Sequence, residues 1–184
     1  MAGVFDHKER IRRILKGART VAIREVRDGQ VAKVSGRVKS SGEPLRAPLT
    51  GRPCVYWEVE VTQWQGTRAL TKRRVHDQRD FVVDDGTGRA LVVVERVAVS
   101  AKIDVRWGQH DLADDRLAEL LRLLGVDGIA GQVTYSEAVI AVGEEVAASG
   151  RGAWERIRIP GSPPAIAIDP SAWPCARVRA SWWW

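Results

Sequence analysis

Two adjacent aspartates, Asp84 and Asp85, come nearest to a catalytic arrangement in this chain. Two carboxylates held close together have separated pKa values, so that one can act as a general acid and the other as a general base. Consecutive side chains at a strand end point in different directions, however, and Asp before Gly86 is typical of a hairpin turn. We therefore interpret this pair as turn residues and predict no catalytic residue here.

The other residue types that carry chemistry are sparse. His7, His76 and His110 are scattered, and no serine or cysteine stands in a recognisable nucleophile motif. Cys54 and Cys175 form no CxxC pair, so neither a disulfide framework nor a zinc site is predicted. We expect a chain that is not an enzyme and that holds no metal and no cofactor.

Length and composition indicate a folded protein. The chain has 184 residues, of which 45% are hydrophobic, and suits one domain or one domain with an appendage. No apolar run approaches the roughly 20 residues of a membrane helix, and the N-terminus lacks the apolar stretch of a secretory signal. We expect a cytoplasmic protein without a membrane span.

The net charge of +6 is unevenly distributed. Residues 1–80 carry 18 Lys and Arg against 9 Asp and Glu, whereas residues 81–184 carry 11 against 14. This asymmetry permits an acidic partner for the first half of the chain.

Residues 31–64 contain two strands with clear alternation. In the first, one face holds Ala32, Val34, Gly36 and Val38, and the other holds Lys33, Ser35, Arg37 and Lys39. In the second, Val55, Trp57, Val59 and Val61 are expected inside, with Tyr56, Glu58, Glu60, Thr62 and Trp64 outside. If these strands pair antiparallel, the basic and acidic rows satisfy each other as cross-strand ion pairs. The alternative is a ligand-binding surface made of Lys33, Arg37, Lys39, Tyr56 and Trp64.

Spacing and turn signals predict the remaining elements. We expect helices over residues 6–18 and 111–124, strands over 20–27, 132–142 and 145–149, an exposed strand or hairpin arm over 68–76, and hairpins over 81–94 and 154–168. The loop over 41–53 contains three prolines and should be stiff.

The chain ends in three tryptophans, Trp182, Trp183 and Trp184, preceded by alternating residues 177–180 that read as an edge strand. Three exposed indoles would form an apolar patch that monomers rarely leave uncovered. We favour docking of this tail on its own domain, and contact with a partner or a lipid surface is the alternative.

Strands, one helix and further strands follow the order of an OB-type barrel, a small Greek-key barrel. We expect a mainly β (α+β) fold, an OB-like antiparallel barrel with an inserted helix and an N-terminal helix. The predicted domains are 1–29 for the N-terminal helix and lead-in strand, 30–170 for the barrel and 171–184 for the tail. An elaborated barrel or a related antiparallel α+β fold is the alternative.

Three sequence segments also resemble a known family: GRVKSSGEPLRAPLTGRPCVYWEVEV, FVVDDGTGRALV and YSEAVIAVGEEVAASGRG. They are similar to the GIDE-type domain, also called the beside-a-membrane domain, of membrane-anchored RING ubiquitin ligases and their prokaryotic relatives. The resemblance covers about residues 30–170. The matching positions are Gly36, Pro48, Thr50, Gly51, Pro53, Cys54, Tyr56, Asp85, Gly88, Gly143 and Gly150.

The chain departs from that family in two ways. Family members carry transmembrane helices around this domain, and their ligase activity resides in a RING, whose paired Cys and His ligands are missing here. The resemblance therefore implies a non-catalytic recognition or scaffold domain that binds a protein partner, without ubiquitin ligase activity.

Single-stranded nucleic-acid binding is the alternative function. OB-type barrels perform it with aromatic platforms and a basic groove, which the basic row and the outward aromatic residues could supply. Glu58 and Glu60 on the same face would repel phosphate, so we expect weak binding at most.

Overall fold

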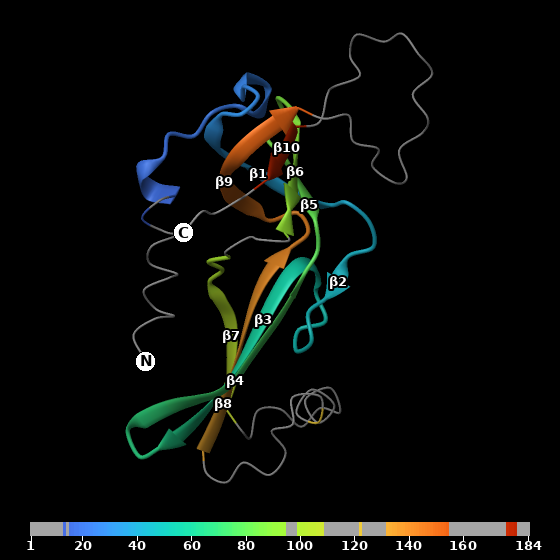
Figure 1. Cartoon of the computed structure of the whole chain (residues 1–184). Coiled ribbons are helices and arrows are strands. Elements are labelled where there is room, and N and C mark those ends of the chain that lie inside the picture. Colours follow the sequence, from blue (N-terminus) through green and yellow to red (C-terminus); the bar gives the residue numbers. More distant parts are fainter. Residues whose placement is uncertain are drawn as a thin grey trace. The chain divides into compact units, whose positions relative to one another are not determined.

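The structure is a computed structural model that describes residues 13, 15–94, 99–108, 122, 132–154 and 176–179. Most of this part is β-strand (Figure 1). It divides into two compact units, each built from separate stretches of the chain. The barrel unit draws on residues 1–44, 79–100 and 142–184, and the sheet unit on 45–78 and 101–141.

Five strands close the barrel unit: β1 (Val31–Ser40), β5 (Phe81–Asp84), β6 (Arg89–Val93), β9 (Glu145–Trp154) and β10 (Ala176–Arg179). Their order around the barrel is β1-β5-β6-β10-β9 and back to β1. β10 runs parallel to β6, whereas every other pair is antiparallel. Closure pairs both edges of each of these five strands.

The alternation predicted for β1 is confirmed. Val34 and Val38 are each 1% exposed and Ala32 is buried as well, while Arg37 and Lys39 are exposed. The strand pairs with β9 over Val31–Arg37 and with β5 over Arg37–Ser40. The period of two therefore places one row of side chains in the barrel core and the basic row on its outer surface.

Gly36 is required where β1 passes the start of the Asp84 turn. A Cβ at this position would lie 2.5 Å from the backbone oxygen of Asp84. In β9, a Cβ on Gly152 would meet Cγ1 of Val26 at the same distance. Both distances are shorter than any side chain tolerates. Glycine at position 36 therefore lets the backbone at Asp84 approach β1, and glycine at position 152 lets the segment around Val26 pack against β9.

The sheet unit contains β2 (Leu45–Arg46), β3 (Pro53–Gln65), β4 (Arg68–Gln78), β7 (Ile103–Gly108) and β8 (Gln132–Ala141). The sheet order is β2-β3-β8-β7, and β4 also pairs with β3. All these pairs are antiparallel. β3 and β4 form a long hairpin that turns at Gly66, whose φ of 60° favours glycine.

One face of the sheet is buried beneath residues 47–52, the loop between β2 and β3. One core cluster holds Leu49, Val59, Val61, Val133 and Tyr135, and a second holds Leu45, Ala47, Cys54, Val139 and Ala141. The partly buried Trp57 packs against both clusters. The proline-containing loop thus covers the hydrophobic core, and its apolar residues are part of that core.

Residues 20–27 do not form the predicted strand. Ile23–Glu25 make a short 3₁₀ turn, η1, and Thr20 contributes only an isolated bridge to Lys33. The backbone N–H of Ile23 donates to the Asp85 carboxylate at 2.8 Å, so it is used by a side chain and not by a neighbouring strand. Ile23 and Val26 are nevertheless buried, which explains why their spacing suggested a strand.

The antiparallel pairing considered for the two alternating strands does not occur. β1 lies between β5 and β9 in the barrel, whereas β3 lies in the sheet unit with β8 on one side and β2 and β4 on the other. Both edges of each strand are therefore already paired with other strands. The residues read as an edge strand, 177–180, are also reassigned, because β10 lies between β6 and β9.

The hairpin over 81–94 and the strands at 68–76, 132–142 and 145–149 are confirmed as β5 and β6, β4, β8 and β9. The helix over 111–124, most of the helix over 6–18, the hairpin beyond Trp154 and the tail Trp182–Trp184 lie outside the described residues. No helix in the described part is long and apolar enough to cross a membrane.

Candidate functional site

The five residues predicted as a binding surface are split between two sheets. Lys33, Arg37 and Lys39 lie on β1 of the barrel unit, and Tyr56 and Trp64 lie on β3 of the sheet unit. Neither strand pairs with the other. The structure therefore does not join the basic row and the aromatic residues on one sheet face.

Tyr56 is not the exposed platform that alternation suggested. Its side chain is 5% exposed, because an irregular register between Cys54 and Tyr56 buries Cys54, Val55 and Tyr56 in succession. The phenol donates to Oε2 of Glu58 at 3.1 Å and stacks on His76 at a centroid distance of 6.3 Å. Burial, followed by the charge of Glu58, raises the pKa of this phenol.

The basic row has contacts of its own. Lys33 Nζ donates to the backbone oxygen of Leu15 at 2.6 Å, and Lys39 Nζ donates to Oδ2 of Asp84 at the same distance. Trp64, on β3, donates from Nε1 to Oγ1 of Thr134 at 3.0 Å. With Tyr56, which stacks on His76 of β4, four of the five residues thus already contact neighbouring segments of their own unit.

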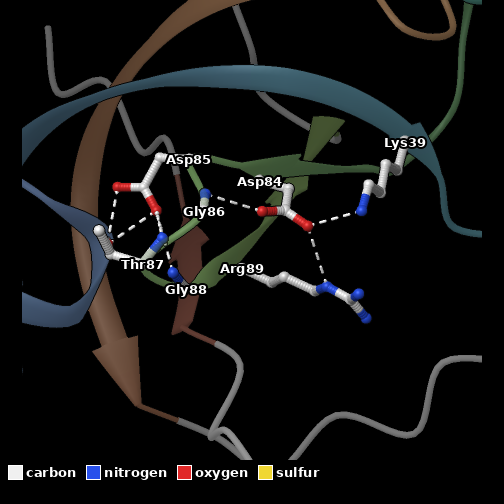
Figure 2. Close-up of polar contacts among 7 residues, drawn as sticks. All are labelled: Lys39, Asp84, Asp85, Gly86, Thr87, Gly88 and Arg89. Carbon is white, nitrogen blue, oxygen red and sulfur yellow. Dashed lines mark hydrogen bonds and ion pairs between the residues drawn. The ribbon is translucent and has the colours of Figure 1, made fainter.

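Asp84 is the centre of an ion-pair group at the end of β5. Its Oδ2 accepts from Lys39 and, at 3.2 Å, from Arg89 Nε, while its Oδ1 accepts from the N–H of Gly86 at 2.9 Å (Figure 2). The hydrogen bond from Lys39 contributes most to lowering the pKa of Asp84, to about 2. Both cationic side chains are half-exposed, so salt should screen part of this attraction.

Asp85 has a different set of partners from its neighbour. Its Oδ1 accepts from the N–H groups of Thr87 and Gly88, at 2.8 and 2.9 Å (Figure 2). Its Oδ2 accepts from the N–H of Ile23 at 2.8 Å. Burial alone would raise the pKa of Asp85, but these hydrogen bonds outweigh burial and lower it. The two carboxylates serve separate contacts, as the turn interpretation predicts.

A buried carboxylate that the sequence reasoning missed lies in the sheet unit. Glu137 on β8 is fully buried and accepts from the N–H groups of Leu49 and Thr50, at 2.7 and 3.1 Å. The hydroxyl of Thr50 donates to the same carboxylate at 2.6 Å. Glu137 therefore attaches the covering loop to the sheet.

The signal for Glu137 was present in the sequence. Along β8, Val133, Tyr135, Val139 and Ala141 alternate as core residues, and Glu137 occupies the middle position of that series. A charge in an apolar row is stable only with hydrogen-bond partners. The position of Glu137 in this row could therefore have predicted a buried carboxylate that binds backbone N–H groups of another segment.

Positions of the family resemblance fall into two groups. Pro48, Thr50, Gly51, Pro53, Cys54 and Tyr56 belong to the covering loop and to the start of β3, and Gly36, Asp85, Gly88, Gly143 and Gly150 belong to the barrel unit. Gly51 and Gly143 have φ angles of 69° and 90°. Gly88 closes the Asp85 turn, and Gly150 pairs with Ala32. Most of these positions set backbone conformation.

Cys54 is a buried core residue. It is 0% exposed, and its Sγ lies 3.6 Å from the backbone oxygen of Leu45. Burial, followed by the nearby Glu137 carboxylate, raises its thiol pKa to about 11. Such a thiol is a poor nucleophile and a poor metal ligand.

The second face of the sheet unit carries a charged group across β3 and β4. Arg74 is hydrogen-bonded to Glu60, with Nε 3.0 Å from Oε2, and lies 3.9 Å from Glu58. The hydrogen bond to Glu60 and both carboxylates raise the pKa of Arg74 despite its partial burial. The acidic row of β3 is therefore paired with Arg74 of β4, and not with the basic row of β1.

No group of three or more potential metal ligands occurs among the described residues. Of the histidines and cysteines, His7, His110 and Cys175 lie outside them. No protein-family model, no curated protein and no solved structure matches the chain in comparisons of sequence and structure.

Proposed function

We propose that the chain is a non-catalytic binding or scaffold module, related to the GIDE-type domain, that recognises a protein partner. The observation that carries this proposal is that the acidic side chains are bound by structural contacts within the fold. Asp85 closes a turn, Asp84 joins two cations, and Glu137 attaches a loop. Groups committed to such contacts are held in place as structural anchors.

The barrel supports an OB-like assignment as the finer description of the fold. Five strands close in the order first, second, third, fifth and fourth, with the third and fifth parallel, when β1, β5, β6, β9 and β10 are counted in chain order. This order and its single parallel pair are those expected of an OB-type Greek-key barrel, and they support the OB-like proposal. The sheet unit is then an elaboration inserted after the first and the third barrel strands.

The resemblance to the GIDE-type domain gains support from the roles of its residues. Gly36 makes a close backbone approach, Gly51 and Gly143 adopt positive φ, and Thr50 joins the Glu137 group. Residues with such roles define a fold rather than a reaction, because none of them presents a reactive group to solvent. A binding or scaffold role follows more directly from such positions than catalysis does.

The test is a pull-down from cells of the source organism with the full chain as bait, with and without nuclease, followed by chemical cross-linking. We expect at least one protein to be retained after nuclease treatment and to cross-link saturably. Retention of nucleic acid instead, with sub-micromolar affinity at physiological salt that falls on Arg37→Glu and Trp64→Ala, would favour the nucleic-acid function. Turnover of any substrate at Asp84 or Asp85 would refute the non-catalytic proposal.

A further inference from the structure

The outer strand of the sheet unit, β4, is basic and pairs with one neighbour among the described strands. Along its length it is hydrogen-bonded to β3, and no other strand of the described part pairs with it (Figure 1). Its sequence RALTKRRVHDQ has four Lys and Arg residues and a single acidic residue, Asp77. An edge strand presents backbone groups to which another strand can add.

An irregularity divides this edge. Val61 pairs with Arg73, but Thr62 pairs with Thr71, so Lys72 is an extra residue of β4. Bulges and lysines on an edge discourage indiscriminate strand addition. Beyond the bulge, Arg73–Gln78 keep a continuous register with β3 over about 20 Å, which is long enough for a short added strand.

The two faces of Arg73–Gln78 differ in what they offer. On one face, Arg74 is bound by Glu58 and Glu60, and His76 stacks on Tyr56. On the other face, Arg73 and Asp77 are exposed, and Val75 is partly buried against the core cluster of Val59 and Val61. Oδ1 of Asp77 accepts from the N–H of Gln78 at 2.8 Å, which leaves Oδ2 for a partner. The face of β4 that carries Arg73, Val75 and Asp77 therefore displays, in order, a cation, an apolar side chain at the margin of the core and an anion.

We propose that Arg73–Asp77 binds an extended segment of a partner protein as an added antiparallel strand. On the shared face, the segment would place a basic or neutral residue opposite Asp77, an apolar residue beside Val75 and an acidic residue opposite Arg73. Further acidic residues would follow toward Lys72 and Arg68. This inference rests on the proposed function, a protein-binding module, and names its partner chemistry.

Strand addition and side-chain selection act together in this mode of recognition. Backbone hydrogen bonds supply affinity, and alternate side chains supply specificity. An apolar residue beside Val75 would extend the existing core cluster, because Val75 lies at its margin. The charge order fixes the direction of the segment, since the reversed segment would bring acid to Asp77 and base to Arg73.

The experiment uses the full chain and a fluorescein-labelled peptide, Gly-Lys-Thr-Val-Thr-Glu-Asp-Glu, in fluorescence anisotropy titrations at about 0.15 M salt. The matched control is the same composition in reversed order. A third peptide carries N-methyl groups on alternate backbone amides. We expect saturable binding of the first peptide, and affinities lower by about tenfold or more for the other two.

Protein variants locate the site. Arg73→Glu should weaken binding about tenfold, while Arg106→Glu, the same change at an exposed position of β7, should alter it less than about twofold. Because Arg73 is exposed, both variants should keep the circular dichroism spectrum and melting temperature of the parent.

Several outcomes would overturn the inference: no saturation up to about 1 mM peptide, equal binding of the reversed or N-methylated peptide, or equal losses for the two variants. Binding of an oligothymidylate, but not of the peptide, through Arg73 would make β4 a phosphate-binding edge instead. The proposed function is judged separately by repeating the pull-down with Arg73→Glu. In one outcome, the variant still captures a protein while the parent fails to bind the peptide. That result would overturn the strand-addition inference but keep the proposed binding function, with the partner docking at another surface.

Discussion

The carboxylate of Glu137 accepts a hydrogen bond from the backbone N–H of Leu49 at 2.7 Å, although the two residues are 88 positions apart. This contact joins the covering loop to a strand that the chain reaches much later. Leu49 itself belongs to the core cluster beneath it. Polar and apolar contacts thus hold the same loop in place.

Glu137→Ala should lower the free energy of unfolding by about 2–4 kcal/mol, because the N–H groups of Leu49 and Thr50 lose a buried acceptor. Glu137→Gln should cost less, since its amide oxygen can still accept from one side. Urea denaturation measures both. The matched control is Glu43→Gln, an exposed change that should stay within about 0.5 kcal/mol. Equal effects of Glu137→Ala and this control would show that the loop is held without the carboxylate.

Gly36→Ala should destabilise the barrel by about 1–3 kcal/mol, because the new Cβ would lie 2.5 Å from a backbone oxygen that cannot easily move. Gly42→Ala is the matched control, since a Cβ there meets nothing within 4 Å. Thermal unfolding should show a clear decrease in melting temperature for the first variant only. A melting temperature unchanged by Gly36→Ala would contradict the close approach of β1 to the Asp84 turn.

Alternation predicted the strands that have one buried and one exposed face. β1 and β8 leave the alternating pattern that burial of one row produces. The hairpin of β5 and β6 was located from its glycine turn, because consecutive residues of both strands are buried. β7 was missed because most of its side chains are exposed or half-buried, which leaves no apolar row to detect. In residues 20–27, apolar spacing was read as a strand although the backbone forms a turn that buries Ile23 and Val26.

Strand partners were harder to predict than strands. The acidic row of β3 is complementary in charge to the basic row of β1, but Arg74 on β4 provides the pairing cation. Charge complementarity alone does not identify the partner, because several basic strands satisfy it equally well. The same limit applies to the candidate surface, where Arg37 and Trp64 proved to lie in different sheets.

Asp84 should stabilise the fold in a pH-dependent manner. Its pKa falls from an ordinary 3.8 to about 2 in the folded chain, chiefly through Lys39. A carboxylate with a lowered folded pKa stabilises the fold above about pH 4, and that contribution is lost as the pH falls toward 2. The difference in unfolding free energy between the parent and Asp84→Asn should shrink over this interval. Because the pair is partly exposed, we expect at most about 1 kcal/mol, and less at high salt. A difference that stays constant from pH 5 to 2 would exclude this role.

Cys54 should resist thiol reagents in the folded chain. Its Sγ is buried, and with a pKa of about 11 only on the order of one molecule in a thousand carries the reactive thiolate at pH 8. The measurement uses a Cys175→Ser background, so that Cys54 is the only thiol, and follows the release of thionitrobenzoate from Ellman's reagent. We expect a reaction slower by at least about a hundredfold in buffer than in concentrated urea, because reagent access requires unfolding. Adding Cys54→Ser should abolish the signal in both conditions. Comparable rates in buffer and in urea would mean that the covering loop opens readily and that Glu137 does not keep it closed.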